Sequence, residues 1–369
     1  MIRIENLSMQ YQSDGKAVHA VREVTLQVGK GQFYTLLGPS GCGKTSMLRS
    51  IAGLERPQGG RILIDGVTVV DAEAGIFVEP NQRNIGMVFQ SYAIWPHMSV
   101  FDNVAFPLRH LRARPAKAEI KQRVSTALQL VKLGGLEERP APYLSGGQQQ
   151  RLALARALVF EPRVLLLDEP LSNLDAKLRE EMRLELRELV HRLGITTLFV
   201  THEQVEALTM SDVVAVMREG RIEQEGSPAA IYRDPQAPFV ADFIGKSNFL
   251  SGTVLALARE GELTMARVAS SIGEFTCRAT AALSIGGSVL VAVRPENLSI
   301  NSSGAGNESG RIYGLVQSVV YLGNLVEVVL QVGDQRLRVQ HHPSDLPSPG
   351  EQMEITFAPG SLHALPTDT

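Results

Sequence analysis

Apolar and polar residues alternate along the first part of the chain. Val24, Leu26 and Val28 take every second position, a period that is typical of a half-buried β-strand. Residues 61–70 contain two apolar runs separated by Asp-Gly, which favours a two-residue hairpin turn. The pattern therefore predicts antiparallel strands over residues 1–37 and a hairpin over 61–70.

Largely apolar runs of four to six residues recur further along, at 33–37, 85–89, 164–167 and 195–200. Such continuous runs are typical of strands that are buried on both faces of a parallel sheet. Apolar residues at helical spacing occupy 115–133 and 176–193, each between two of these runs. Strands that alternate with helices predict an α/β domain built around a parallel sheet.

The texture of the chain changes near residue 236. Prolines punctuate the sequence there, and short strand-like runs separated by Gly, Asn and Asp follow. Strands at this spacing predict a small all-β barrel. We therefore expect a first domain over 1–235, a linker over 236–246 and a β-barrel domain over 247–369, with a loop at 301–307.

Length and composition are compatible with two globular domains. The 369 residues suffice for two hydrophobic cores, and 44% of them are apolar while 20% are charged, as in ordinary globular proteins. The net charge of −3 excludes a global basic field that would attract nucleic acid or anionic lipid. Cys42 and Cys277 offer no disulfide framework, and no apolar run is long enough to span a bilayer, so we expect a cytoplasmic protein.

Residues 38–45 match a known phosphate-binding motif. They fit the pattern G-x-x-x-x-G-K-[ST] at every required position and lie between a predicted strand and a predicted helix. Glycines allow successive backbone N–H groups to face a phosphate, and the helix N-terminus adds positive charge. Lys44 can reach the β- and γ-phosphates, and the Thr45 hydroxyl can bind Mg²⁺. We therefore predict a nucleoside-triphosphate site that contains Gly38, Pro39, Ser40, Gly41, Cys42, Gly43, Lys44 and Thr45.

Polar side chains follow three of the predicted buried strands. Gln90, the pair Asp168-Glu169 and His202 each stand at such a strand end. Two carboxylates after four buried aliphatic residues are costly unless they meet water or a cation. Beside the phosphate loop, Asp168 would hold Mg²⁺ through water and Glu169 would polarise the attacking water. The alternatives are that Gln90 caps its strand, that the acids cap a helix and that His202 is structural.

Two further segments each allow an ordinary and a functional interpretation. Residues 144–148, Leu-Ser-Gly-Gly-Gln, open a helix, so Ser145 is either an N-cap or part of a second phosphate-binding helix terminus. Residues 92–98 are unusually apolar and contain Pro96, which makes them either core or a docking surface. Tyr11, a single aromatic residue at a strand end, is by itself a packing residue.

Taken in order, these motifs resemble the ATPase subunit of an ATP-binding cassette (ABC) transporter over about the first 235 residues. The resemblance rests on motifs that follow one another in the family's order: the phosphate loop, Gln90, residues 144–148, residues 165–169, Asp175 and His202. It implies a P-loop fold with antiparallel β and helical subdomains. It also implies ATP as substrate, Mg²⁺ as cofactor, and hydrolysis that is coupled to solute transport.

The resemblance implies a role for each site residue. Four are expected to act in hydrolysis, with Glu169 as the catalytic carboxylate: Lys44, Gln90, Glu169 and His202. Three are expected to hold Mg²⁺: Thr45, Gln90 and Asp168. Tyr11 would stack on adenine, and Ser46, where the family usually has Thr, keeps a hydroxyl beside the phosphate loop.

The same resemblance implies a homodimer. In the family, the signature loop faces ATP that is bound by the opposite subunit; here that loop is Leu144, Ser145, Gly146, Gly147 and Gln148. Two ATP molecules would therefore lie between two copies of the chain, and Asp175 would communicate across the dimer. Because ATP would bind the closed dimer better, it would shift the equilibrium towards closure.

The C-terminal part resembles the accessory TOBE domain, an OB-like β-barrel found in importer ATPases. Residues 243–245, 248–250 and 293–297 match the short sequence motifs that are usual in this domain. The resemblance implies a binding-protein-dependent importer of the sugar, polyamine and ferric-iron group, and the sequence of residues 91–97 is closest to that of ferric-iron importers. The implied partners are a membrane permease that docks on residues 92–97 and, indirectly, a periplasmic or lipid-anchored solute-binding protein. The chain would then lie at the cytoplasmic face of the inner membrane.

A different class, the relatives that act on ribosomes or DNA, usually carries two tandem cassettes or a long coiled-coil insertion. The chain shows neither, and its slightly acidic charge disfavours nucleic acid as a partner. The C-terminal domain is alternatively a regulatory module for cargo or a signalling protein. The sequence does not encode the solute, because an ATPase subunit is not expected to line the transport path.

Overall fold

The computed structural model describes residues 1–13, 16–111, 113–261, 263–280, 283–302, 312–343 and 346–367. Contacts divide the chain into two compact units, Met1–Ala229 and Ala230–Thr369, and each is described by itself.

The division between the units falls a few residues before the predicted domain end at 235. Helix α8, Pro238–Phe243, lies inside the segment predicted as a linker, and Ala241 in this helix is fully buried. That segment therefore packs into the second unit. Of the predicted loop at 301–307, the part from residue 303 onward lies outside the described residues.

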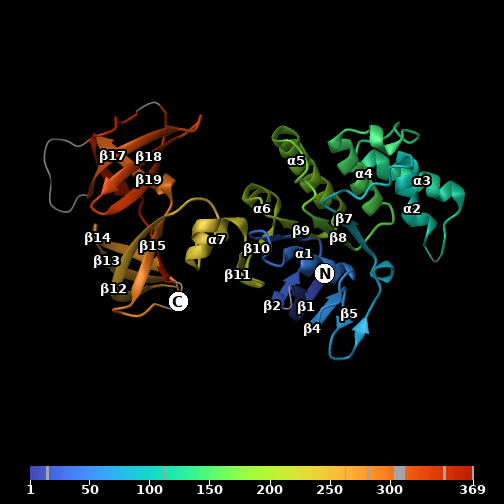
Figure 1. Ribbon diagram of the computed structural model, residues 1–369, viewed down its shortest axis with the longest axis horizontal. Coiled ribbons are helices and arrows are strands. Elements are labelled where there is room, and N and C mark those ends of the chain that lie inside the picture. The colour runs from blue at the N-terminus through green and yellow to red at the C-terminus, as the bar shows by residue number, and fades with distance from the viewer. Residues whose placement is uncertain are drawn as a thin grey trace. The chain divides into compact units, whose positions relative to one another are not determined.

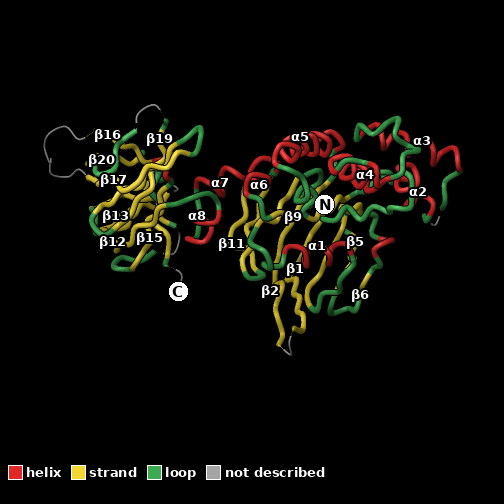
Figure 2. The backbone as a smooth tube through the Cα atoms, turned by 45° about the horizontal axis from the view of Figure 1, so that its top comes forward, coloured by secondary structure: helices red, strands yellow, loops and turns green. Residues whose placement is uncertain are grey.

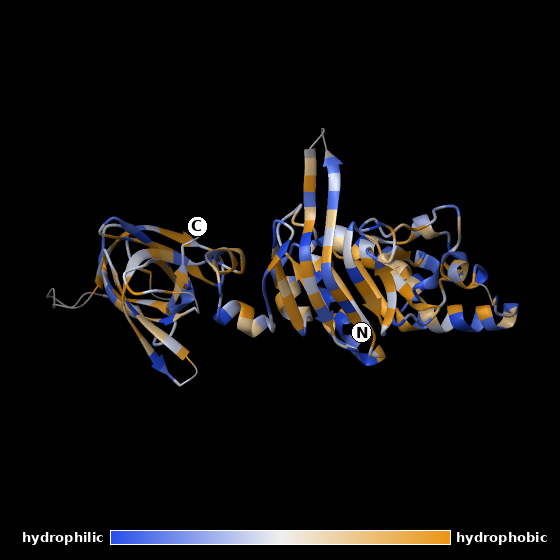
Figure 3. Ribbon diagram, turned by 90° about the horizontal axis from the view of Figure 1, so that it is seen from below, coloured by the Kyte–Doolittle hydropathy of each residue, from blue (hydrophilic) through white to orange (hydrophobic). Residues whose placement is uncertain are grey.

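The first unit opens with an antiparallel sheet. Its strands are, in spatial order, β2 Lys16–Val28, β1 Ile2–Ser13, β4 Gly59–Ile64, β5 Val67–Asp71 and β6 Ile76–Phe77. Figure 3 shows the alternation of apolar and polar residues along the long β1–β2 hairpin. The predicted hairpin over 61–70 is confirmed as β4 and β5. Asp65 and Gly66 between them both have positive φ, as the favoured hairpin turn requires.

A second, mostly parallel sheet carries the four predicted buried strands (Figure 1). Its strands are, in spatial order, β11 Arg221–Gly226, β10 Val213–Arg218, β3 Phe33–Leu37, β9 Thr196–Thr201, β8 Val164–Asp168 and β7 Ile85–Val88. Strand β3 pairs parallel with β9 and β10. The prediction that residues 33–37 continue the antiparallel strands is therefore wrong. All five of these residues are buried, and a strand without a solvent-facing side suits a covered parallel sheet.

Alternate residues of β8 face two different hydrophobic cores. Leu165 and Leu167 pack in one core together with helices α2 to α5. Val164 and Leu166 pack in the other, together with α1 and the antiparallel sheet. Both faces of the parallel sheet are thus covered, which explains why its strands read as continuous apolar runs.

The helices of the first unit follow the predicted spacing. They are α1 Lys44–Ala52, α2 Val100–Arg109, α3 Lys117–Leu130, α4 Gly146–Leu158, α5 Ala176–Leu193 and α6 Gln204–Met210, with short 3₁₀ turns at Pro80–Gln82 and Ala141–Tyr143. Helices α2, α3 and α4 pack together as one group (Figure 2). The predicted helices over 115–133 and 176–193 are confirmed as α3 and α5.

The second unit is β-rich, as predicted. A closed barrel is formed by β12 Asn248–Glu260, β13 Leu263–Ser270, β14 Gly273–Ala279, β21 His363–Pro366 and β15 Ser288–Val293. A separate sheet is formed by β16 Leu298–Ser302, β20 Gln352–Phe357, β17 Ile312–Tyr321, β18 Val326–Val332 and β19 Gln335–His341. Helix α7, Pro228–Arg233, precedes α8, and a 3₁₀ turn spans Pro295–Asn297. One hydrophobic core contains residues from both the barrel and the sheet, so the predicted barrel is accompanied by a second layer.

Within the described part of the chain, every helix is too short or too polar to cross a bilayer.

Candidate active site

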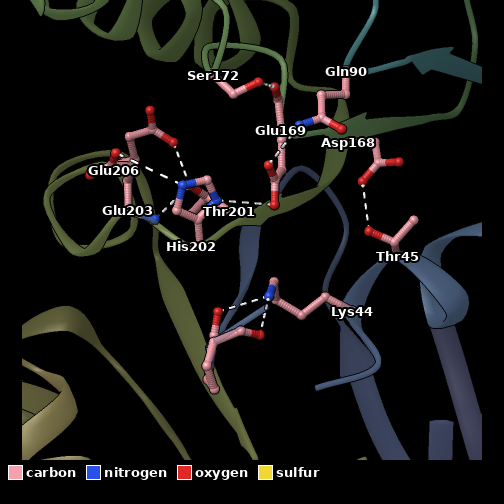
Figure 4. Close-up of polar contacts among 12 residues, drawn as sticks. Lys44, Thr45, Gln90, Asp168, Glu169, Ser172, Thr201, His202, Glu203 and Glu206 are labelled. Atoms are coloured by element: carbon pink, nitrogen blue, oxygen red, sulfur yellow. Dashed lines mark hydrogen bonds and ion pairs between the residues drawn. The ribbon is translucent and has the colours of Figure 1, made fainter. Parts of the chain in front are cut away.

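The carboxyl ends of the parallel strands meet at one edge of the second sheet. Leu37 of β3 pairs with Thr201 of β9, and Asp168 of β8 pairs with the residue before Thr201. Side chains that follow these strands therefore emerge next to one another, although they are far apart in sequence. Figure 4 shows the predicted site residues gathered around this edge, with α1 and its preceding loop on one side.

The predicted phosphate loop, residues 38–45, runs from the end of β3 into α1. The residue that precedes α1 is Gly43, whose φ of 104° lies in the left-handed region that favours glycine. A Cβ here would lie 2.1 Å from the Ala20 carbonyl oxygen, so a larger residue does not fit. The Gly220 N–H donates to the Cys42 carbonyl oxygen at 3.0 Å and braces the loop from the β10–β11 turn.

Lys44 is the positive charge at the centre of this loop. It is only 5% exposed, and its Nζ donates to the carbonyl oxygens of Gly38 at 2.8 Å and Pro39 at 3.0 Å. No ion pair joins it to a residue that the structure describes. A buried ammonium group whose oxygen partners are neutral carbonyls favours the approach of an anion such as phosphate.

A cavity of about 470 Å³ opens beside the loop. Its walls include the predicted residues Tyr11, Thr45, Gln90 and Glu169. Small-molecule sites have volumes of about 300–1,000 Å³, so the cavity is large enough for a nucleotide.

Tyr11 is held at the wall of this cavity through its hydroxyl group. The hydroxyl donates to the Glu55 carboxylate and is hydrogen-bonded to the Ser46 hydroxyl, with its oxygen 3.0 Å from Ser46 Oγ. Burial raises the pKa of Tyr11, and the contact with Glu55 raises it further. The raised pKa keeps the hydroxyl group neutral. Tyr11 is also 39% exposed, so its ring is available for contact with a ligand.

Asp168, the last residue of β8, is 6% exposed. Its Oδ1 accepts a hydrogen bond from Thr45 Oγ1 at 3.1 Å. Burial raises the pKa of this carboxyl group, the neighbouring Glu169 adds to the increase, and the Thr45 contact opposes it. A cation beside Asp168 would stabilise the ionised carboxylate.

The donor set at this edge suits a hard cation. Thr45 offers a hydroxyl, Asp168 a carboxylate and Gln90 an amide oxygen. The described residues contain no group of three or more His, Cys, Asp and Glu side chains that could hold a metal ion. Mg²⁺ prefers oxygen ligands and is usually held by one or two carboxylates together with waters and substrate phosphates. The residues present therefore fit Mg²⁺ that is bound together with a phosphate ligand.

Replacing Asp168 by Asn is expected to stabilise the nucleotide-free protein at neutral pH. The folded-state pKa of Asp168 lies above its ordinary value of 3.8. The unfolded chain therefore loses this proton at a lower pH than the folded chain, and the free energy of unfolding falls as the pH rises above 3.8. Asn keeps an acceptor for Thr45 without the charge. We expect the variant to melt a few degrees above the wild type at pH 7, and the difference to shrink as the pH falls towards 4. Thermal unfolding over this pH range measures it, and a variant less stable at pH 7 would contradict the electrostatic argument.

Glu169 follows β8 with a φ of 43°, a conformation that is strained for a residue other than glycine. Its N–H donates to the Val200 carbonyl oxygen at 3.0 Å, which helps to hold this conformation. Glu169 Oε1 lies 3.1 Å from His202 Nδ1, and Oε2 accepts from Gln90 Nε2 at 3.1 Å (Figure 4). Gln90, Glu169 and His202 thus form one connected polar group.

The Leu144–Gln148 segment is not part of the cavity wall. Ser145 is the N-cap of α4: its Oγ accepts from the Gln148 N–H at 3.4 Å, and Gln148 Oε1 accepts from the Ser145 N–H at 3.0 Å. The ordinary interpretation of Ser145 is therefore confirmed. Ser145 and Gly146 are also exposed, so this helix terminus is open to a partner. Asp175 caps α5 in the same way by accepting from the Leu178 N–H at 3.0 Å.

Sequence reasoning missed several residues around the site. Val18 and His19 of β2 line the cavity. The signal that could have found them is the hairpin register, in which Tyr11 pairs with Val18. Asn173 Nδ2 donates to the Gln90 carbonyl oxygen at 2.7 Å. No sequence motif predicts this contact, because the two residues lie 83 positions apart in the chain.

Comparison with protein families gives two matches. Residues 21–172 match the family described as ABC transporter, and residues 291–365 match the TOBE domain. The chain is 45% identical to the spermidine/putrescine import ATP-binding protein PotA of Rubrobacter xylanophilus, across 96% of this chain and 91% of that protein. It is 43% identical to the Fe(3+) ions import ATP-binding protein FbpC of Photobacterium profundum, across 94% of each.

Two solved structures of ABC transporter cassettes are similar to part of the chain. The dimeric structure of MJ0796, described as a bacterial ABC transporter cassette, matches with a TM-score of 0.54 and 31% identity, over 62% of this chain and 99% of that one. A post-hydrolysis state of this cassette bound to ADP and Pi matches with a TM-score of 0.54 and 30% identity over the same shares.

Proposed function

The chain belongs to the ATP-binding subunits of the ABC transporter family, and on this premise we propose that it powers a binding-protein-dependent importer. The predicted family and the predicted fold, an ABC ATPase followed by an all-β TOBE domain, are confirmed. The chain is thus an ATPase. The observation that carries the proposal for its site is the meeting of Lys44, Asp168, Glu169 and His202 at one sheet edge.

ATP would occupy the cavity beside the phosphate loop. The backbone N–H groups of residues 38–45 and the ammonium group of Lys44 would bind its phosphates. The ring of Tyr11 would stack on the adenine, with its hydroxyl tethered to Ser46 and Glu55. Mg²⁺, which neutralises phosphate charge when it is bound, would be held by Thr45, Gln90 and Asp168.

Hydrolysis would use the connected group of Gln90, Glu169 and His202. Glu169 would accept a hydrogen bond from the attacking water and take its proton. Gln90 and His202 hold the two oxygens of this carboxylate at 3.1 Å each and would thereby orient it. His202 would also contact the γ-phosphate.

A second copy of the chain would complete each site. The exposed N-terminus of α4, with Ser145 as its cap, does not reach the cavity of its own chain. Facing the cavity of a second copy, it would present its N–H groups and a hydroxyl to the γ-phosphate. Two ATP molecules would then join two copies, and Asp175 would lie near the interface. The dimeric structure of the similar cassette MJ0796 supports a dimer of this chain.

A permease segment would dock on an apolar groove beside β7. The groove has a volume of about 340 Å³, and Phe89, Trp95, Phe106 and Phe160 are among the residues that line it. The Trp95 ring packs on Phe106 with centroids 4.3 Å apart, and the Arg156 guanidinium lies 4.6 Å from the Trp95 ring. This would place the chain at the cytoplasmic face of the membrane, with a solute-binding protein on the other side.

The cargo would be a polyamine or ferric iron, with a sugar or another organic solute as the alternative. The relatives named above are import proteins for spermidine/putrescine and for Fe(3+) ions. Uptake of labelled spermidine and of ⁵⁵Fe(III) by cells with and without the intact gene distinguishes the two classes.

The proposed activity is tested with the purified full chain. We expect release of inorganic phosphate from ATP that depends on Mg²⁺ and rises more than linearly with protein concentration, because two copies build each site. A chain that binds ATP but releases no phosphate, alone and with its permease, would refute the proposal.

A further inference from the structure

The turn at residues 171–175, which leads from Glu169 into α5, contacts two of the residues proposed for hydrolysis directly. The Ser172 hydroxyl donates to the Glu169 carbonyl oxygen at 3.0 Å. Asn173 Nδ2 donates to the Gln90 carbonyl oxygen at 2.7 Å. The same turn ends at Asp175, which is proposed to lie near the second copy. The turn therefore lies where a second copy could displace it. Within the connected group of Gln90, Glu169 and His202, His202 is the member without a hydrogen bond or ion pair to this turn in the described part of the chain.

Arg179, on the first turn of α5, supplies an indirect contact to His202. Its Nη2 donates to the Leu174 carbonyl oxygen at 2.9 Å, and its Nη1 donates to Glu203 Oε1 at 3.2 Å. Its Nε is buried and has no hydrogen-bond partner among the described residues. The guanidinium group therefore joins the turn to the residue after His202 through its two terminal nitrogens.

Glu203 carries this connection to the histidine. Glu203 Oε1, the atom that Arg179 contacts, lies 4.0 Å from His202 Nε2 (Figure 4). The other ring nitrogen, Nδ1, lies 3.1 Å from Glu169 Oε1. The imidazole thus stands between two carboxylates, one proposed for catalysis and one held by Arg179.

We propose that Arg179 is a positioning residue that couples the turn at 171–175 to His202 through Glu203. The proposal rests on the proposed function, because it requires that Glu169 and His202 act on ATP and that a second copy contacts the turn. A second copy that displaces the turn would displace the Leu174 carbonyl, and with it the guanidinium and Glu203. The distance between His202 and Glu169 would then depend on closure of the dimer.

A purely structural role for Arg179 makes different predictions. The Arg179 and Glu203 side chains are 28% and 42% exposed, and ion pairs with this exposure contribute little to stability. A structural arginine would lower the melting temperature and affect ATP binding and turnover together. A positioning residue would affect turnover and leave ATP binding by the single chain unchanged.

The first test compares Arg179→Ala with Arg187→Ala in the full chain. Arg187 lies on the same helix, is exposed, and also donates to a backbone carbonyl, that of Thr209. We expect kcat for ATP to fall about tenfold in Arg179→Ala and to remain near the wild-type value in Arg187→Ala. We expect the Kd for a fluorescent ATP analogue to stay within about twofold of the wild type in both.

The second test combines Arg179→Ala with Glu203→Ala. If the two side chains act as one connection, the double variant has the kcat of the single variants, whereas independent effects multiply. Arg179→Lys keeps the charge but replaces the planar fork by a single ammonium group, so we expect it not to restore kcat. Should Arg179→Ala unfold, Glu203→Gln, at an exposed side chain, tests the same connection alone.

Multiplying effects, recovery in Arg179→Lys, or a parallel loss of ATP binding would each overturn the coupling. These outcomes differ from failure of the proposed function. In that case the wild type itself would have no ATPase activity against which the variants could be compared.

Discussion

Glu169→Gln is expected to abolish turnover while ATP binding is retained. Glu169 is the carboxylate that both Gln90 and His202 contact, each at 3.1 Å. The amide of the Gln variant cannot take a proton from water. Removal of a general base typically lowers the rate by about 10²–10⁴-fold. Gln keeps the size of the side chain and an oxygen that can accept from Gln90, so the cavity is preserved. We therefore expect ATP to accumulate in an unreacted, dimeric complex.

Steady-state phosphate release and size-exclusion chromatography with ATP measure the two consequences. Glu180→Gln, which changes an exposed carboxylate on α5, is the matched control and should behave as the wild type. Wild-type ATPase activity in Glu169→Gln would remove this residue from the role of base. Loss of ATP binding would show instead that its charge serves to build the site.

Ser145→Phe is expected to block hydrolysis without weakening ATP binding by the single chain. Ser145 is exposed at the N-terminus of α4 and lies outside the cavity of its own chain. A bulky side chain there would keep the helix terminus of a second copy away from the γ-phosphate. We expect kcat to fall by about 100-fold or more, as for the loss of preorganised hydrogen-bond donors. The Kd for an ATP analogue at low protein concentration should not change.

A mixing experiment separates this explanation from a folding defect. Ser145→Phe also removes the N-cap, which costs about 1 kcal/mol, and Ser145→Ala shares that loss without the bulk. A mixture of Ser145→Phe with Lys44→Ala should regain activity, because a mixed dimer contains one site with an intact loop and an intact helix terminus. No recovery in a mixture that forms mixed dimers would contradict the assignment of Ser145 to the second copy.

Much of the fold could be read from short stretches of sequence. The runs at 33–37, 85–89, 164–167 and 195–200 predicted buried strands because burial on both faces requires apolar residues at every position. The Asp65-Gly66 hairpin turn and the glycine at position 43 follow from φ values that other residues reach only with strain. These features depend on a residue and its nearest neighbours, so local sequence determines them.

The residues of the site could also be predicted from the sequence, but the contacts between their side chains could not. Polar residues at strand ends predicted Gln90, Asp168, Glu169 and His202, because parallel strands place their carboxyl ends at one edge. Which side chains touch there depends on the strand order β3-β9-β8-β7. That order places Gln90 and His202 on the two oxygens of Glu169.

The phosphate loop, the buried strands and the family could be identified from consecutive residues or from the order of the motifs along the chain. Three features became visible only in the folded chain: β3 belongs to the parallel sheet, the second unit has a sheet beside its barrel, and Arg179 joins a turn to Glu203. The physical reason is that a hydrogen bond or an ion pair requires two groups within a few ångströms of each other. That distance depends on how strands pair across the whole unit, so it cannot be predicted from a local pattern of residues.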